Sequence, residues 1–344
     1  MDSPLPLPRT ASPSPQLRTI TSLTLPLAPL CPACGTPVVA ARLEAFHSYE
    51  LFACSVCDLH FWEPRLMPDA RRCARIFADR DVRLLPLEPG HLFFLADPRA
   101  PRGGTLLDAG CGTGNFLIAA WNAGYSVAGV ELDRQAARFA AAQCGSARVH
   151  PLSLEQFVEQ YPLLRFDSVC LFEVLEHQAD PARFLQSALS VLQPRGYIAL
   201  SVPNRDRWLT GTDPLDYPPN HFLRWNASSL RAFLELHGLE VLSLRQQSAG
   251  VRYAAQMFNI ALRSGISARV VPDLPAAFCE AIQCDAPQPR ASAGSPSLRL
   301  RAVTALAKIK FACCFPLALL AMPYVRWKRY RGAYLYCLAR RRSP

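Results

Sequence analysis

A glycine-rich loop that follows an aspartate is the first part of the chain where reactive side chains lie close together. The stretch TLLDAGCGTGNF places Asp108 two residues before Gly110, and Gly112 and Gly114 follow. Glycines at the start of a helix let a ligand approach the backbone N–H groups closely, as phosphate-binding loops do. A carboxylate at this position would repel a phosphate. The pattern therefore predicts a nucleotide-like ligand that presents a cationic group to Asp108.

A second acid, Glu131, lies twenty-one residues after Gly110, at the end of the next apolar run. An acid at this place in a nucleotide-binding fold accepts hydrogen bonds from ribose hydroxyls. The predicted ligand therefore contains an unphosphorylated ribose. An NAD-dependent oxidoreductase would need the pattern GxGxxG, and GCGTG followed by Asn115 and Phe116 lacks its third glycine.

Strands and helices alternate around these residues, which predicts a doubly wound α/β fold with a parallel sheet. The predicted strands are 105–110, 125–133, 147–153, 166–177, 198–204 and 239–247. The predicted helices are 114–124, 133–145, 181–193 and 226–238, with a turn at 194–197 and an N-cap at Asn226 or Ser228. Ligands of such sheets bind at the C-terminal ends of the strands, where both acids lie.

Residues 100–245 resemble the class I S-adenosylmethionine-dependent methyltransferases. Their first motif, close to DxGxGxG, is matched by DAGCGTG at 108–114, and three later segments look like the family's later motifs: ELD at 131–133, FDSVCLFEVLEHQADP at 166–181 and LQPRGYIALSVPN at 192–204. The resemblance implies that the methionine end of the cofactor, with its ammonium, lies against the glycine loop. Asp108 would then face a cation.

The same resemblance implies a set of S-adenosyl-L-methionine contacts. Asp108 lies at the lip of the loop, and the family positions assign the methionine part to Gly110, Cys111, Gly112 and Gly114, the ribose and adenine to Glu131 and Leu132, the adenine edge to Leu152 and Ser153, and closure of the pocket to Phe172 and Glu173. We expect no nucleophilic role for Cys111, because small residues are common in this loop and no histidine follows at the spacing of a base.

Methyl transfer depends mainly on alignment, and the protein must also handle the proton of an oxygen acceptor. The candidates are Glu173, Glu176 and His177 in EVLEH, and His221 in DYPPNHFLRW. The EVLEH run resembles that of ubiquinone-pathway O-methyltransferases and of plant small-RNA 2′-O-methyltransferases. In the latter, such residues hold a divalent ion, so the resemblance implies a Mg²⁺ or Mn²⁺ site here. The alternatives are catalysis by His221 with Glu173 and His177, without an ion, and purely structural roles.

Two cysteine pairs predict a structural zinc site. CPACG at 31–35 and CSVC at 54–57 place Cys31, Cys34, Cys54 and Cys57 at the spacing by which two short hairpins bind one tetrahedral zinc. Four thiolates leave no open coordination position for catalysis. Thirteen cysteines, an odd number, and the absence of a secretory signal favour a reducing cytoplasm over a disulfide framework.

Composition divides the chain into five expected parts. They are a disordered Pro-rich leader at 1–30, a zinc ribbon at 31–64, a methyltransferase core at 65–249, a variable insertion at 250–331, and a final strand with a basic tail at 332–344. The resemblance makes GAYLYCLAR at 332–340 the last, antiparallel strand. We therefore expect a seven-stranded Rossmann-like methyltransferase sheet, a small zinc ribbon N-terminal to it in the sequence, and a helical insertion before the last strand.

The formal charge of +10 is concentrated at the C-terminal end, where eleven Lys and Arg and no acid follow Pro296. The apolar run from Phe311 to Val325 is fifteen residues long with two prolines. That is shorter than the roughly twenty residues that cross a bilayer. The segment is predicted either to lie peripherally on an anionic membrane or to form a helical lid over the domain.

Three functions remain open at this stage. The first is methylation of an oxygen on a small molecule, glycan or lipid-linked intermediate. The second is carbon methylation of a nucleotide sugar, because certain sugar C-methyltransferases also carry a four-cysteine module. The third is a non-catalytic zinc and basic-tail protein that binds nucleic acid or membrane. The few basic residues in 31–64 argue against nucleic acid as a partner of the zinc ribbon.

Overall fold

The computed structural model describes residues 28–39, 42–66, 86–145, 148–208, 216–263 and 298–342. Most of the predicted leader, the first part of the predicted core up to residue 85, and the predicted loop at 264–297 lie outside the described residues.

The core is a seven-stranded mixed sheet in the order β10-β11-β8-β7-β4-β5-β6. Its strands are β4 Gly104–Ala109, β5 Tyr125–Val130, β6 Val149–His150, β7 Phe166–Phe172, β8 Leu192–Pro203, β10 Leu239–Ser248 and β11 Arg331–Arg341. Neighbours from β6 to β8 pair in parallel, and β11 pairs antiparallel with both β8 and β10. The predicted seven-stranded α/β sheet is confirmed.

The last strand in the sequence occupies a position inside the sheet, between β8 and β10. Cys337 lies opposite Leu200 of β8 and Leu244 of β10. The run from Leu335 to Ala339 is fully buried. A strand that is covered on both faces needs such a continuous apolar run, which explains the composition of YLYCLA.

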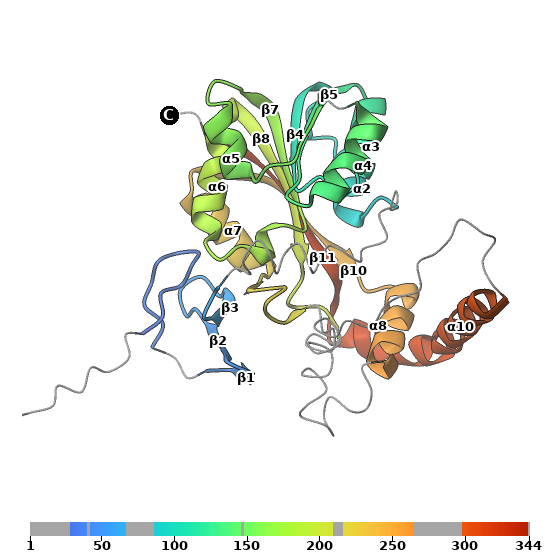
Figure 1. Ribbon diagram of the computed structural model, residues 1–344. Helices are drawn as coiled ribbons and strands as arrows, with labels where there is room; N and C mark the ends of the chain where they lie inside the picture. Colours follow the sequence, from blue (N-terminus) through green and yellow to red (C-terminus); the bar gives the residue numbers. More distant parts are fainter. Residues whose placement is uncertain are drawn as a thin grey trace, which may run out of the picture.

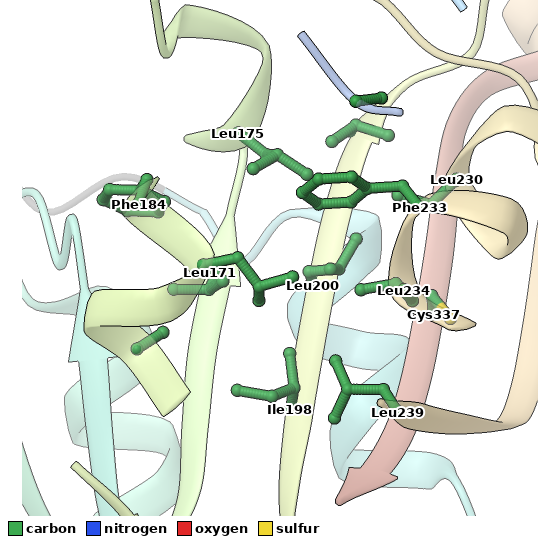
Figure 2. Close-up of a cluster of buried hydrophobic side chains, with 14 of the residues drawn as sticks. Leu171, Leu175, Phe184, Ile198, Leu200, Leu230, Phe233, Leu234, Leu239 and Cys337 are labelled. Carbon is green, nitrogen blue, oxygen red and sulfur yellow. The ribbon is translucent and has the colours of Figure 1, made fainter. Parts of the chain in front are cut away.

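Among the described residues, helices lie on both faces of the sheet, three of them on each (Figure 1). One layer is α2 Pro89–Ala96, α3 Asn115–Asn122 and α4 Arg134–Cys144, and the other is α5 Leu154–Gln160, α6 Pro181–Ser190 and α7 Ala227–Leu236. Each layer packs against the sheet through its own apolar cluster. Figure 2 shows part of the second cluster, in which Phe233 and Leu234 of α7 approach Leu200 of β8.

Side-chain caps begin four of these helices, of which only the cap of α7 was predicted, and α2 and α5 were not among the predicted helices. Asp133, Ser153 and Asp180 each accept a hydrogen bond from a backbone N–H in the first turn of the helix that follows. Asn226, one of the two predicted caps of α7, accepts from Ser229 N–H at 2.9 Å. Such caps satisfy N–H groups that have no partner within the helix.

The boundary between α6 and β8 differs from the prediction. The helix ends at Ser190 rather than at residue 193, and β8 begins at Leu192, which lies opposite Phe166. The predicted turn is a register shift inside the ladder, because the next pair is Ser168 with Tyr197. Burial of Leu192 in the core favours the strand over another helical turn.

The cysteine segment forms a small antiparallel sheet of β1 Glu44–Phe46, β2 Tyr49–Ala53 and β3 His60–Glu63. A fourth strand, β9 Leu223–Arg224, lies after β8 in the sequence and pairs with β3. Leu59 and Phe61 join the same buried cluster as Phe222 and Trp225. The cysteine segment therefore shares its apolar interior with the main domain.

The chain between β10 and β11 contains two described helices, α8 Val251–Arg263 and α10 Leu298–Trp327, which pack against each other away from the central sheet (Figure 1). Trp208, which follows β8, joins their apolar cluster, and Tyr253 Oη donates to the Trp208 carbonyl at 3.2 Å. Within the described parts of the chain, no helix has the length and apolar character needed to cross a membrane.

Candidate functional site

The glycine loop joins the end of β4 to the start of α3. Gly110 N–H and Cys111 N–H both donate to the Val130 carbonyl, at 2.8 and 3.0 Å, which holds the loop against β5. Gly110 has a φ of +89°, and a Cβ placed on it would lie 2.6 Å from Val174 Cγ2. The loop can take this shape only with glycine at that position.

Glu131 follows β5 and faces the loop. Its Oε2 accepts from Gly112 N–H at 2.9 Å, and its Oε1 accepts from Asp133 N–H at 2.8 Å. These two bonds fix the orientation of the carboxylate. A carboxylate oxygen can accept more than one hydrogen bond, so the side chain is of the type that binds the ribose hydroxyls predicted from the sequence.

Asp108 lies at the end of β4 and is 3% exposed. Burial, together with the nearby Glu131 and Glu88 carboxylates, raises the pKa of Asp108 to about 8. A large share of this carboxyl is therefore protonated at neutral pH when no cation is beside it. A bound cation would favour the ionised form and release the proton.

The acids of the site form a row of five carboxyls. They are Glu131, Asp108, Glu88, Glu173 and Glu176. The charges of Glu131 and Glu88 raise the pKa of Asp108, the charge of Glu88 raises the pKa of Glu173, and the charges of Glu173 and Glu88 raise the pKa of Glu176. They come from β5, β4, the start of α2 and the segment after β7. So many like charges in a partly buried site are unfavourable unless protons or a cation balance them.

Glu88 and His91 belong to this site, although the sequence analysis assigned them no role. Glu88 N–H donates to His91 Nδ1 at 3.1 Å, and the His91 ring stacks on Phe116 at 4.9 Å between ring centroids. Burial lowers the pKa of His91 to about 4, so its imidazole is neutral. The only signal in the sequence was Pro89 after an acid, a pattern typical of a helix start.

Glu173 adopts a left-handed backbone conformation, with φ of +52°, directly after β7. Its N–H donates to the Ser201 carbonyl at 3.0 Å, and its Oε1 accepts from Ser201 Oγ at 2.7 Å. A non-glycine residue adopts this conformation at a cost, and such strain is concentrated at functional sites. Glu173 is therefore held in place by Ser201 of β8.

The other predicted cofactor residues have more varied surroundings. Phe172 is buried and packs edge-on against Phe116, with ring centroids 4.9 Å apart. Leu132 is 54% exposed after β5, Leu152 is partly buried, and Ser153 Oγ caps α5. Cys111 is buried, and burial raises the pKa of its thiol well above the usual value, so the thiol stays protonated. A protonated, enclosed thiol is a poor nucleophile.

Glu176, His177 and His221 form a second cluster beside these acids. Glu176 Oε1 lies 3.8 Å from His177 Nε2 and 3.9 Å from His221 Nε2, and the two rings are 4.8 Å apart at their centroids. Glu176 is 1% exposed, and its Oε2 has no hydrogen-bond partner among the described residues. The fourth residue of the predicted metal set, Glu173, lies outside this close group.

Both histidines are oriented through their other ring nitrogen. His177 Nδ1 lies 2.6 Å from the Asn220 carbonyl, and His221 Nδ1 lies 3.6 Å from Asp216 Oδ1. Burial opposes ionisation of Asp216, but His221 and the paired Arg207 guanidinium outweigh it and lower the pKa of Asp216 to about 2. This arrangement points both Nε2 atoms toward Glu176, as in histidines that bind metals.

The cysteine segment supports this cluster through β9. Trp62 N–H of β3 donates to the Phe222 carbonyl at 2.9 Å, and Phe222 N–H donates to the Glu176 carbonyl at 3.0 Å. The Tyr217 ring packs on Phe46 and Trp62. The loop that carries His221 therefore lies between the cysteine segment and the segment after β7.

The four predicted zinc ligands meet at one point. Cys31 Sγ and Cys57 Sγ are 3.5 Å apart, as are Cys34 Sγ and Cys54 Sγ, and all four sulfurs lie within 4.8 Å of one another. Zinc–sulfur bonds of about 2.3 Å in a tetrahedron place sulfurs about 3.8 Å apart. The spacing of the thiols fits one tetrahedral ion.

The chain is similar to known methyltransferases. A family model described as a methyltransferase domain matches residues 79–244. A protein of Mycolicibacterium smegmatis named "Probable S-adenosylmethionine-dependent methyltransferase" is 30% identical over 180 residues, which cover 50% of this chain and 67% of that protein. The ubiquinone biosynthesis O-methyltransferase of Paracidovorax citrulli is 33% identical over 116 residues, or 32% of this chain and 48% of that relative.

The chain thus spans only about half the length of several of the relatives it matches. Among solved structures, the cyclopropane synthase MmaA2 of Mycobacterium tuberculosis is 16% identical with a TM-score of 0.47, over 80% of this chain and 99% of that chain.

We predict that Asp108→Asn changes the pH dependence of stability in ligand-free protein. The folded pKa of about 8 lies above the unfolded value near 3.9, so the wild type loses stability as pH rises between them, by up to about 1.4 kcal/mol per pH unit. The variant lacks this loss, so its advantage over the wild type should grow from pH 5 to about pH 9. Urea unfolding across this range measures the difference. Glu159→Gln on the exposed side of α5 is the control, and a difference that does not change with pH would contradict the prediction.

Proposed function

The chain belongs to the S-adenosylmethionine-dependent methyltransferases, and from this premise we propose that it methylates an oxygen atom of a small molecule, a glycan or a lipid-linked intermediate. The observation that carries the proposal is the cluster of Glu176, His177 and His221, in which Glu176 is also close enough to Glu173 and Glu88 for their charges to raise its pKa. Relatives named ubiquinone biosynthesis O-methyltransferases support oxygen as the acceptor atom.

The group of carboxyls at the site suits a ligand that carries positive charge. S-adenosylmethionine, when bound, supplies an electrophilic methyl group on a sulfonium, and it also carries an ammonium. We assign the ammonium to Asp108 and the ribose to Glu131, with Leu132, Leu152 and Ser153 near the adenine and Phe172 and Glu173 at the inner wall. The raised pKa values of Asp108 and Glu173 support this assignment, because a cation would relieve the repulsion in the row of carboxyls.

The acceptor hydroxyl would lie at the cluster. His177 and His221 direct Nε2 toward Glu176, whose Oε2 lacks a partner among the described residues. His221 can take the proton of the acceptor, with Asp216 orienting its ring through Nδ1. The same three donor atoms also suit Mg²⁺ or Mn²⁺, which would lower the pKa of a hydroxyl bound to it.

The four cysteines support a structural zinc. Two similar turns present the thiols: Gly35 N–H donates to the Cys31 carbonyl at 2.8 Å, and Asp58 N–H donates to the Cys54 carbonyl at 3.0 Å. The residues that close these turns, Gly35 and Asp58, both have positive φ. Zinc would hold the two turns together and stabilise the sheet that β9 completes. The free thiols of the described cysteines support a reducing compartment such as the cytoplasm.

Carbon methylation of a nucleotide sugar is the second candidate, and the cysteine module is the feature that favours it. That reaction also needs a base beside the acceptor, and His221 could serve either reaction. The carbon-13 chemical shift of a transferred methyl group separates a methoxy product from a C-methyl product.

We predict micromolar binding of S-adenosylmethionine that Asp108→Ala and Glu131→Ala each weaken by at least tenfold. Each variant removes a charged partner of the ligand, and hydrogen bonds to charged groups contribute about 1.5–3 kcal/mol. Titration calorimetry measures the affinity, with Glu159→Ala as the control. Equal affinity in all four proteins would contradict the assigned pocket.

We predict that Glu176→Gln and His221→Ala lower methyl transfer by a factor of about 100 or more, with little change in cofactor affinity. The assay uses carbon-13 methyl-labelled cofactor with catechol, UDP-glucose and a total lipid extract as acceptors. The exposed His47→Ala is the matched control. Loss of activity after removal of loosely bound divalent ions, with recovery on adding Mg²⁺, assigns an ion to the cluster. Full activity in both variants would contradict its catalytic role.

We predict about one zinc per chain, lost in Cys54→Ser and retained in Cys313→Ser. Loss of the ion should loosen β3 and β9, so methyl transfer should fall more than cofactor affinity does. Elemental analysis and calorimetry on the same preparations measure both quantities. A Cys54→Ser protein with normal zinc content would rule out this ligand set.

A further inference from the structure

The two helices of the insertion expose different kinds of side chain. The exposed positions described for α8 are Arg252 and Gln256, which are polar. α10 exposes an apolar row, named here the α10 stripe: Cys313, Leu317, Leu320, Tyr324 and Trp327. Leu320 is 79% exposed and Trp327 is 73% exposed. The two helices pack side by side, so their location in the protein does not explain why α10 exposes apolar side chains and α8 exposes polar ones.

The spacing of the α10 stripe places it on one side of the helix. Its members follow one another at intervals of four, three, four and three residues, which is the period of a single helical face. The residues that pack against α8 lie on another side: Cys314, Ala318, Met322 and Val325. Over residues 312–325, the part of α10 before its basic end for which side-chain burial is described, the helix is therefore apolar both where it is packed and where it is exposed. A surface helix is ordinarily polar on its exposed face.

Positive charge gathers at the end of the stripe. Four exposed basic side chains follow Val325: Arg326, Lys328, Arg329 and Arg331. Lys328 Nζ lies 4.6 Å from the centroid of the Trp327 ring. The sequence from Pro296 to Pro344 contains no acid. A partner of this surface must therefore accept apolar side chains and supply negative charge together.

An anionic bilayer surface meets both requirements. Aliphatic side chains enter the boundary of the acyl chains, Tyr and Trp favour the interface, and basic side chains attract acidic headgroups. A second copy packed on α10 would bring the same basic cluster and no acid from this segment. Nucleic acid would leave the leucines without apolar contact.

We propose that α10 lies in the surface of an anionic membrane, with the α10 stripe in the acyl boundary and the four basic side chains at the headgroups. This binding is peripheral. Of the two interpretations that the sequence left open, the exposure of the stripe favours membrane contact over a lid packed on the domain.

The position of the helix pair suggests a use for this contact. Tyr253 of α8 binds the carbonyl of Trp208, and the preceding residue, Arg207, pairs with Asp216 beside His221. Membrane contact would hold the candidate acceptor cluster near the lipid surface, where a lipid-linked acceptor would be presented. This last step rests on the proposed function, whereas the membrane contact does not.

Vesicle flotation of the full chain tests the proposal without any assay of methyl transfer. The vesicles are phosphatidylcholine alone or phosphatidylcholine mixed with phosphatidylglycerol. The test variant is the double substitution Leu317→Gln with Leu320→Gln. Its matched control replaces two exposed leucines elsewhere, Leu163→Gln with Leu236→Gln, which are 89% and 60% exposed in the wild type.

We expect the wild type to bind vesicles that contain phosphatidylglycerol, more weakly at high salt, and to bind phosphatidylcholine poorly. The double variant on α10 should lose at least tenfold in partitioning, and the control should stay within about twofold. Each of Arg326→Gln, Lys328→Gln and Arg329→Gln should lower partitioning about fivefold at low salt.

Two results would overturn the proposal. Equal partitioning by the α10 variant and its control would exclude the α10 stripe as the membrane contact. Absence of vesicle binding, together with a dimer in light scattering that the α10 variant abolishes, would assign the stripe to a second copy of the chain. Failure of cofactor binding would leave either vesicle result unaffected.

Discussion

The parallel pairing of β4 with β5 on one side and β7 on the other is the constraint on which the site depends. In this register Asp108 lies opposite both Gly129 and Cys170, so the chain leaves all three strands at the same edge of the sheet. Asp108, Glu131 and Glu173 are thereby brought together from separate parts of the sequence. Burial raises the pKa of Asp108 and of Glu173 to about 8. The sheet thus creates an environment that is unfavourable for anions alone and favourable for a cationic ligand.

A second pairing connects the cysteine module to the acceptor side. β9 is only two residues long, yet it pairs with β3, and it begins two residues after His221. The backbone bonds of Phe222 to Trp62 and to Glu176 continue this connection to the segment after β7. Without β3, the loop that carries His221 would lose its backbone bond to the cysteine segment. The module is therefore part of the structure that positions the cluster, although its own residues supply none of the three donors.

The insertion differs from the central domain in where its large apolar side chains lie. In the central domain, large apolar side chains are concentrated in the two clusters that cover the sheet. On α10, several leucines and aromatic side chains remain exposed next to basic residues. Exposed apolar side chains next to basic residues support the proposed membrane contact of α10.

The sequence by itself determined the features that depend on short spacing: the glycine loop, the cap of α7 and the two cysteine pairs. Its resemblance to a methyltransferase family implied the seven-stranded sheet whose last strand is the apolar run near the C-terminus. The sequence also located Glu176, His177 and His221 as related residues. Only the tertiary structure decided that Glu173 turns to Ser201, that Glu88 and His91 join the site, that Arg207 and Asp216 lie behind His221, and which side of α10 is exposed. Local patterns set backbone conformation and burial tendency, which sequence spacing reports directly. Contacts between segments far apart in the chain depend on how packed elements place their side chains, and spacing carries no record of that.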